Sequence, residues 1–131
     1  MTVLIGYVPT PAGEAALEHG LSEASRRGAD VVLVNSPRRG ATVDARLVDD
    51  DAARQLVARA AARGVTATVD HADHGADLVE TFEALVERTG ADLVVIGLRH
   101  RTPVGKLVMG SSAQRLLLEL RVPILAVKAA T

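Results

Sequence analysis

The chain has 131 residues, of which 48% are apolar, and this fits a single domain, residues 1–131, with a core on both faces of a sheet. It has no Cys and no Trp, which excludes disulfides, thiolate chemistry and Cys-based metal sites and argues against stacking of a flavin. A formal net charge of −1 gives no long-range field to gather nucleic acid or an anionic membrane.

The first part of the chain alternates a short apolar run with a helical pattern. Val3–Val8 is typical of a strand. Thr10 then has the position of an N-cap, with Pro11 as the first helical residue and Gly28 closing the helix. Val31–Asn35 is an almost continuous apolar run, which predicts a second, buried strand.

The middle of the chain repeats this alternation twice. The acidic run at residues 49–51 suits the positive end of a helix, which Gly64 ends. Val65–Asp70 alternates polar and apolar residues, as a less buried strand does. Asp77 caps the next helix, and Gly90 terminates it.

The last part of the chain contains a third repeat and a final strand. Leu93–Ile96 is the most apolar strand and runs directly into Gly97. A long loop leads to Ser111, where capping-box spacing predicts the start of a helix. Pro123 precedes the final strand, Ile124–Val127, at a position where a missing amide is tolerated.

The order of these elements predicts an α/β fold with a doubly wound, Rossmann-like sheet of five parallel strands. Crossovers of this length join parallel strands with right-handed connections. The weakly apolar third strand and the proline-initiated fifth strand suit the two edges, which predicts the strand order 3-2-1-4-5. Ligands then collect at the switch point between strands one and four, where residues 9–10 and 97–109 leave the sheet.

The loop from Gly97 to Ser112 carries the features of an anion site. Gly97 lacks a Cβ and leaves the backbone open to a ligand, while Gly110 and Ser111 stand where free amides and a helix dipole attract anions. Between them lie four further candidates for contact with a phosphate, namely Arg99, His100, Arg101 and Lys106.

Two other phosphate motifs do not fit. In a P-loop, Ser or Thr follows the Gly-Lys pair, whereas Leu107 follows Gly105-Lys106 here. No Gly-x-Gly-x-x-Gly follows the first strand, so we expect neither NAD nor flavin as a cofactor.

In these features the chain resembles the universal stress protein family over its whole length. Gly97, the nine residues from Arg101 to Met109, and Gly110-Ser111 stand in register with that family's loop motif, and Arg121–Lys128 is similar to its last strand. The resemblance implies a flavodoxin-like fold, a homodimer paired through Ile124–Val127, and ATP or another adenine nucleotide as ligand, with Mg²⁺ able to accompany it.

Three residues depart from the family pattern. His100 replaces a glycine of the loop, Val8 stands where nucleotide-binding members usually have an aspartate, and Ala113 replaces a serine or threonine. With these departures in view, we predict twelve nucleotide-contacting residues: Val8, Pro9, Thr10, Asn35, Ser36, Gly97, Arg99, His100, Lys106, Gly110, Ser111 and Ser112.

The resemblance implies a nucleotide-binding protein with a role in stress response or signalling, and we expect it to be cytoplasmic. Its apolar runs are too short to span a bilayer, and its first residues lack the pattern of an export signal. No general base or metal-binding carboxylate is visible in the loop, so we expect no catalytic residue, no metal site and at most slow hydrolysis. The alternatives are a nucleotide-free dimeric interaction module of the same fold and a weak ATPase.

Overall fold

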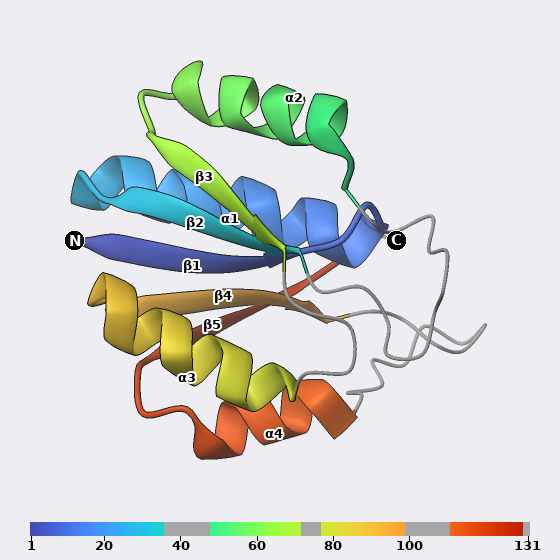
Figure 1. The fold of residues 1–131 in the computed structure, drawn as a ribbon, viewed down its shortest axis with the longest axis vertical. Coiled ribbons are helices and arrows are strands. Elements are labelled where there is room, and N and C mark those ends of the chain that lie inside the picture. The colour runs from blue at the N-terminus through green and yellow to red at the C-terminus, as the bar shows by residue number, and fades with distance from the viewer. Residues whose placement is uncertain (36–47, 72–76, 99–110, 130–131) are drawn as a thin grey trace.

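The computed structural model describes residues 1–35, 48–71, 77–98 and 111–129, with the side chains of Ser111 and Ser112 left out. Strands and helices alternate along these ranges (Figure 1). The strands are β1 (Thr2–Tyr7), β2 (Asp30–Asn35), β3 (Ala67–His71), β4 (Leu93–Leu98) and β5 (Ile124–Lys128). The helices are α1 (Pro11–Arg27), α2 (Asp50–Ala61), α3 (Leu78–Thr89) and α4 (Ser111–Glu119).

All neighbouring strands are parallel, and their order in the sheet is β3-β2-β1-β4-β5. Central strand β1 pairs with β2 on one side and with β4 on the other, so that Val3 has Val31 and Leu93 as its neighbours. This confirms the predicted α/β class, the strand order and the two edge strands. The switch point therefore lies between β1 and β4.

Helices cover both faces of the sheet, α1 and α2 on one face and α3 and α4 on the other (Figure 1). Because successive residues of a strand point to opposite faces, each central strand supplies both cores. Val3 and Ile5 of β1 pack beneath α1 and α2, while Leu4 packs with Phe82 of α3 and Leu116 of α4. The nearly continuous apolar strands of the sequence follow from this double burial.

The predicted ends of α1 and α3 are confirmed, whereas α2 ends at Ala61, three residues before the predicted Gly64. The hydroxyl of Thr10 accepts a hydrogen bond of 3.2 Å from the amide of Gly13 at the start of α1. Asp49 and Asp77 cap α2 and α3 through their carboxylates. Gly28 closes α1 in the left-handed conformation, with φ of 63°, where a side chain would be strained.

Two strand boundaries differ from the prediction by two residues, and the other differences are of a single residue. Strand β4 continues through Gly97 to Leu98, because these residues pair with Val127 and Lys128 of β5. Strand β3 begins at Ala67 rather than at Val65, whose amide instead donates to the carbonyl of Ala60 and closes the end of α2.

None of the helices in the described ranges is long and apolar enough to cross a membrane.

Candidate functional site

A cavity of about 190 Å³ opens at the carboxyl ends of β1 and β4, at the switch point of the sheet. Residues at the ends of β1, β2 and β4 form its floor, and the first two turns of α3 and α4 form its far wall. Its lining consists of Gly6, Tyr7, Val8, Val34, Leu78, Phe82, Ile96, Gly97, Ala113 and Leu116.

The described lining of this cavity contains no charged side chain. Val34, Phe82 and Ile96 are buried members of the core beneath α3 and α4. Tyr7 belongs instead to the core beneath α1, where its hydroxyl donates to Oε1 of Glu14 at 2.6 Å. The cavity therefore offers apolar surface and backbone groups, which suits a flat, uncharged ring better than a phosphate.

Three helices begin around this cavity and direct their amino termini toward the same edge of the sheet (Figure 1). These are α1 at Pro11, α3 at Leu78 and α4 at Ser111. A helix amino terminus carries a partial positive charge, and at α1 and α3 one amide is already bonded, to Thr10 and Asp77 respectively. An anionic group beside the apolar cavity would thus meet a favourable potential.

Three of the predicted contacts, Val8, Pro9 and Thr10, follow β1, and one of them is in the described lining of the cavity. Val8 is half-buried and lines it, and Pro9 is exposed. Thr10 uses its hydroxyl to cap α1. Its amide donates to the carbonyl of Val8 at 2.7 Å, which makes the turn from β1 into α1 tight.

Asn35 is fully buried at the end of β2 and holds three parts of the chain together. Its amide nitrogen donates to the carbonyl of Tyr7 at 3.1 Å, and its Oδ1 accepts from the amide of Val48 at 3.0 Å. The side chain predicted to contact a ligand therefore links β1, β2 and the segment that enters α2.

Gly97 serves the packing of α1 on the sheet. A Cβ at this position would lie 2.0 Å from the carbonyl oxygen of Ala12, in the first turn of α1. The missing side chain lets β4 and α1 approach closely, a reason that differs from the predicted approach of a ligand.

The other predicted contacts fall outside the described residues. These are Ser36, Arg99, His100, Lys106 and Gly110. Ser111 begins α4, in agreement with its predicted place at a helix start, and the side chains of Ser111 and Ser112 are not described.

Sequence reasoning missed Gly13, which shapes the turn beside the cavity. A Cβ on Gly13 would lie 1.8 Å from the carbonyl oxygen of Val8, so glycine lets the first turn of α1 fold against the end of β1. A glycine in the first turn of a strongly predicted helix was the available signal, since glycine is otherwise unfavourable there.

A second missed feature is a polar network on the opposite face of β1. Glu14 accepts from Tyr7, and its Oε2 accepts from Arg59 of α2 at 2.9 Å. Burial, followed by the hydrogen bond and the negative charge of Glu14, raises the pKa of Tyr7 to about 12. Burial acts to raise the pKa of Glu14 as well, but hydrogen bonds from Arg59 and Tyr7 outweigh it and hold this pKa below its ordinary value.

Within the described ranges, no three side chains of His, Cys, Asp or Glu gather as metal ligands would.

The sequence of this chain is similar to a known protein family and to an individual member of it. The model of the universal stress protein family matches residues 1–128. A universal stress protein of Mycolicibacterium smegmatis is 41% identical over 126 residues, which are 96% of each chain.

Solved structures agree with the fold. A universal stress protein from Archaeoglobus fulgidus superposes with a TM-score of 0.79 at 25% identity, over 98% of each chain. A universal stress protein from the same organism, solved in complex with dAMP, superposes with a TM-score of 0.70 at 19% identity, again over 98% of each chain.

Proposed function

Because the chain belongs to the universal stress protein family, we propose that it binds an adenine nucleotide, of the ATP or AMP type, at the switch point between β1 and β4. The observation that carries this proposal is the apolar cavity beside three helix amino termini. An adenine ring suits the cavity, and a phosphate suits the helix ends. The complex of a relative of the same fold with dAMP supports the choice of an adenine nucleotide.

In this proposal the phosphates lie over the loop between Gly97 and Ser112. Amides at Gly110, Ser111 and Ser112 donate to phosphate oxygens at the start of α4, and the cationic side chains Arg99, His100 and Lys106 neutralise their charge. Mg²⁺ that accompanies the nucleotide binds to its phosphates.

The base and sugar lie on the β1 and β2 side of the cavity. Val8 forms part of the wall there, with Pro9 and Thr10 next along the chain, and Asn35 ends β2 just before Ser36. Since the side chain of Asn35 already bonds the carbonyl of Tyr7 and the amide of Val48, we assign it the role of fixing this wall.

Because no carboxylate, histidine, lysine or arginine side chain is in the described lining of the cavity, we infer that the protein senses or stores its nucleotide rather than consuming it. We propose that it does so in the cytoplasm, as a homodimer, in a stress response or a signalling role.

Calorimetric titration with ATP, AMP and cyclic AMP, each with and without Mg²⁺, tests the proposal. We expect saturable binding of at least one nucleotide, and we expect Gly110→Val to abolish it because the added side chain blocks the amino terminus of α4. The matched control Ala84→Val adds bulk to the exposed face of α3 and should leave binding unchanged. Absence of heat with all three nucleotides would contradict the proposal, and unaltered binding by Gly110→Val would contradict the loop assignment.

A nucleotide-free interaction module is the second candidate, because Val8 leaves the cavity without the carboxylate common in nucleotide-binding members. The variant Val8→Asp separates the two. If the wild type binds no nucleotide and Val8→Asp gains binding, the protein is a nucleotide-free interaction module. If the wild type binds and releases no phosphate from ATP at equimolar protein, nucleotide sensing is correct.

A further inference from the structure

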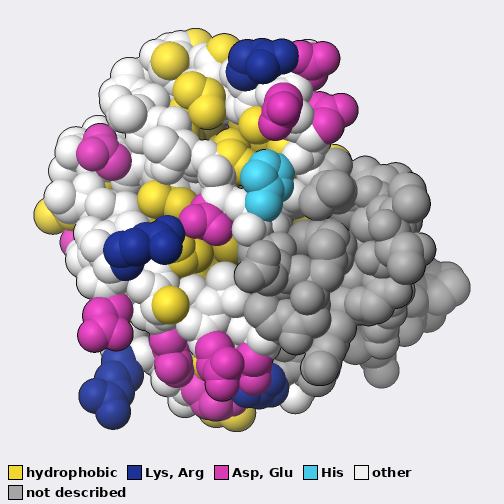
Figure 2. All heavy atoms as spheres, viewed as in Figure 1, with side chains coloured by type: hydrophobic (Ala, Val, Ile, Leu, Met, Phe, Trp, Pro, Cys, Tyr) yellow, Lys and Arg dark blue, Asp and Glu magenta, His cyan; other side chains and the backbone are white. Residues whose placement is uncertain are grey.

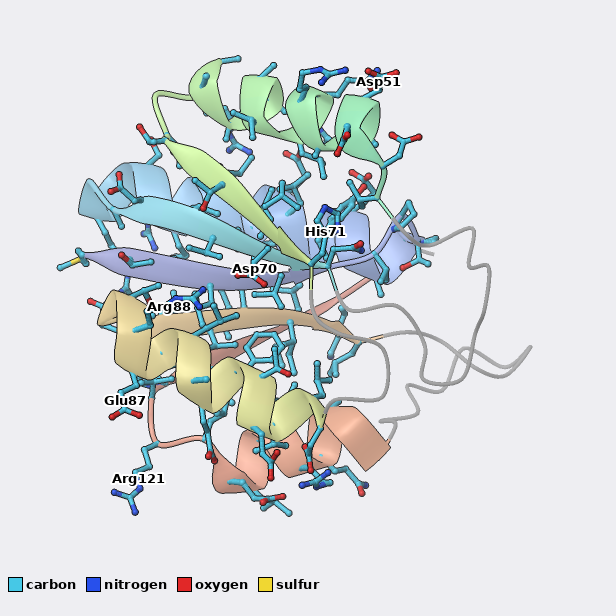
Figure 3. All side chains as sticks on the ribbon, viewed as in Figure 1. Asp51, Asp70, His71, Glu87, Arg88 and Arg121 are labelled. Carbon is cyan, nitrogen blue, oxygen red and sulfur yellow. The ribbon has the colours of Figure 1, made fainter. Side chains whose placement is uncertain are left out.

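A second hollow, of about 480 Å³, lies between the carboxyl ends of α3 and α4, at the opposite end of the sheet from the nucleotide cavity. We call it the α3–α4 groove. Its lining consists of Glu83, Val86 and Glu87 of α3 with Glu119, Leu120, Arg121 and Val122 at the end of α4. Glu87 and Arg121 mark this end of the molecule in Figure 3. Among the residues that the structure describes, none lines both hollows.

The α3–α4 groove has an apolar floor and a charged rim. Val86, Leu120 and Val122 are half-buried and pack against the core beneath α3 and α4. Beside the rim, Leu118 is 85% exposed, the most exposed of the large apolar side chains on the described helices. Apolar surface of this kind, bordered by charges, is typical of protein interaction sites.

The rim is mainly acidic, with the exposed carboxylates of Glu83, Glu87 and Glu119. Figure 2 shows acidic side chains gathered over α3 and α4 at the lower edge of the molecule. Glu119 pairs with Arg115 at 3.0 Å, whereas Glu83, Glu87 and Arg121 form no ion pair within the described ranges.

Two of these carboxylates, Glu87 in the last turn of α3 and Glu119 at the end of α4, stand where the stability of the helices would favour cations. The carboxyl end of a helix carries partial negative charge, which is unfavourable for a nearby carboxylate. Helices α1, α2 and α3 each have arginine in their last turn, and α4 has none. In α3 that arginine, Arg88, reaches away from the groove to Asp70 of β3, at 3.0 Å (Figure 3). The two helix dipoles and the carboxylates of Glu83 and Glu87, unpaired in the described part of the chain, therefore give the rim a negative potential, which Arg121 offsets in part.

We propose that the α3–α4 groove docks a cationic amphipathic segment of another protein. Apolar side chains of that segment cover Val86, Leu120 and Val122, and its Lys or Arg side chains meet Glu83, Glu87 and Glu119. Charge complementarity selects this occupant over an acidic or purely apolar one. The mode is that of an amphipathic helix laid into a groove, whose anchors recur at helical spacing. It is independent of the nucleotide cavity.

Fluorescence anisotropy with a labelled peptide tests this proposal. The probe is an amphipathic peptide of Leu and Lys, about five helical turns long, and a peptide in which Ser replaces each Leu serves as its comparison. We expect saturable binding of the Leu/Lys peptide and at least roughly tenfold weaker binding of the Ser/Lys peptide, because only the former buries apolar area. Equal binding of the two peptides would mean general attraction of cations and would overturn the proposal.

Variants of the rim locate the site. Glu83→Gln with Glu87→Gln should weaken binding roughly three- to tenfold, since each carboxylate contributes one exposed ion pair. The matched control Glu23→Gln with Asp51→Asn removes as many carboxylates from α1 and α2 and should change binding less than about twofold. Equal loss in both double variants would overturn the assignment to this groove.

One variant tests the apolar floor of the α3–α4 groove, and melting curves test whether the variants are folded. Val86→Thr keeps the shape of the side chain and adds a hydroxyl to the floor, so it should weaken the Leu/Lys peptide several-fold without affecting the Ser/Lys peptide. Melting curves verify that each variant is folded. Amide chemical shifts should respond to the peptide at residues 83–87 and 119–122, and a response confined to other residues would contradict the proposal.

Discussion

At the scale of the residue, the environment of Tyr7 shifts the pKa of its phenol. Tyr7 is the one tyrosine of a chain without Trp, so the ultraviolet absorbance of its phenolate reports this group alone. Burial and the hydrogen bond to Glu14 raise its pKa from 10.0 to about 12. A raised pKa means that folding favours the neutral phenol. This contribution to stability is complete below pH 10 and is lost as the pH rises toward 12.

We therefore expect the native protein to titrate near pH 12 and the urea-unfolded protein near pH 10. Glu14→Gln should lower the native midpoint, because it removes the negative charge beside the phenol, while Glu23→Gln elsewhere on α1 should leave it in place. Circular dichroism over the same range separates titration from alkaline unfolding. A native midpoint near 10 would refute the buried hydrogen bond.

At the scale of the element, close contact between β4 and α1 depends on Gly97. A Cβ there would lie 2.0 Å from the carbonyl of Ala12, whereas a Cβ on Gly6 of the adjacent strand would lie 3.5 Å from its nearest neighbour, Cζ of Phe82. We expect Gly97→Ala to lower the free energy of unfolding by about 2 kcal/mol, because backbone must move to admit the methyl group. Gly6→Ala should change it by less than about 1 kcal/mol. Urea denaturation measures the free energy of unfolding of both variants. Equal losses in Gly97→Ala and Gly6→Ala would show that the close approach of Ala12 does not require glycine at position 97.

At the scale of the whole molecule, β5 leaves an apolar strand at the edge of the sheet. Ile124, Leu125 and Ala126 are half-buried, and such an edge invites pairing with another strand. The carbonyl of Pro123 accepts a hydrogen bond from the amide of Val94, and the amide of Ala129 donates one to the carbonyl of Leu98. Because every second residue of a strand bonds the same neighbour, the amide of Ala126 points away from β4, toward the open edge. We expect a homodimer paired through this edge.

Light scattering after size-exclusion chromatography tests the dimer at micromolar concentration. Ala126→Pro removes an outward amide and should yield the monomer mass while keeping the hydrogen bonds to β4. Val69→Pro is the matched control on β3, the opposite edge strand. The carbonyl of Thr66 accepts from the amide of Val31 of β2, so by the same alternation the amide of Val69 also points away from the sheet. A monomeric wild type, or equal dissociation by both variants, would rule out pairing through β5.

The sequence by itself determined the elements and their order in the sheet, because these depend on local chemistry. Thr10, Asp49 and Asp77 cap helices through amides that lie two or three residues away. Gly28 adopts a backbone conformation that other residues avoid. Short connections and right-handed crossovers then leave few arrangements of five parallel strands, which is why the order 3-2-1-4-5 was predictable.

The tertiary structure alone decided what several of the predicted site residues do, because their partners are distant in the sequence. Gly97 meets the backbone of Ala12, and Asn35 bonds both Tyr7 and Val48. No periodicity or spacing encodes such pairs. The lining of the cavity was likewise fixed only when α3 and α4 packed on the sheet, since hydrophobic pattern specifies which face is buried but not which side chains meet across it.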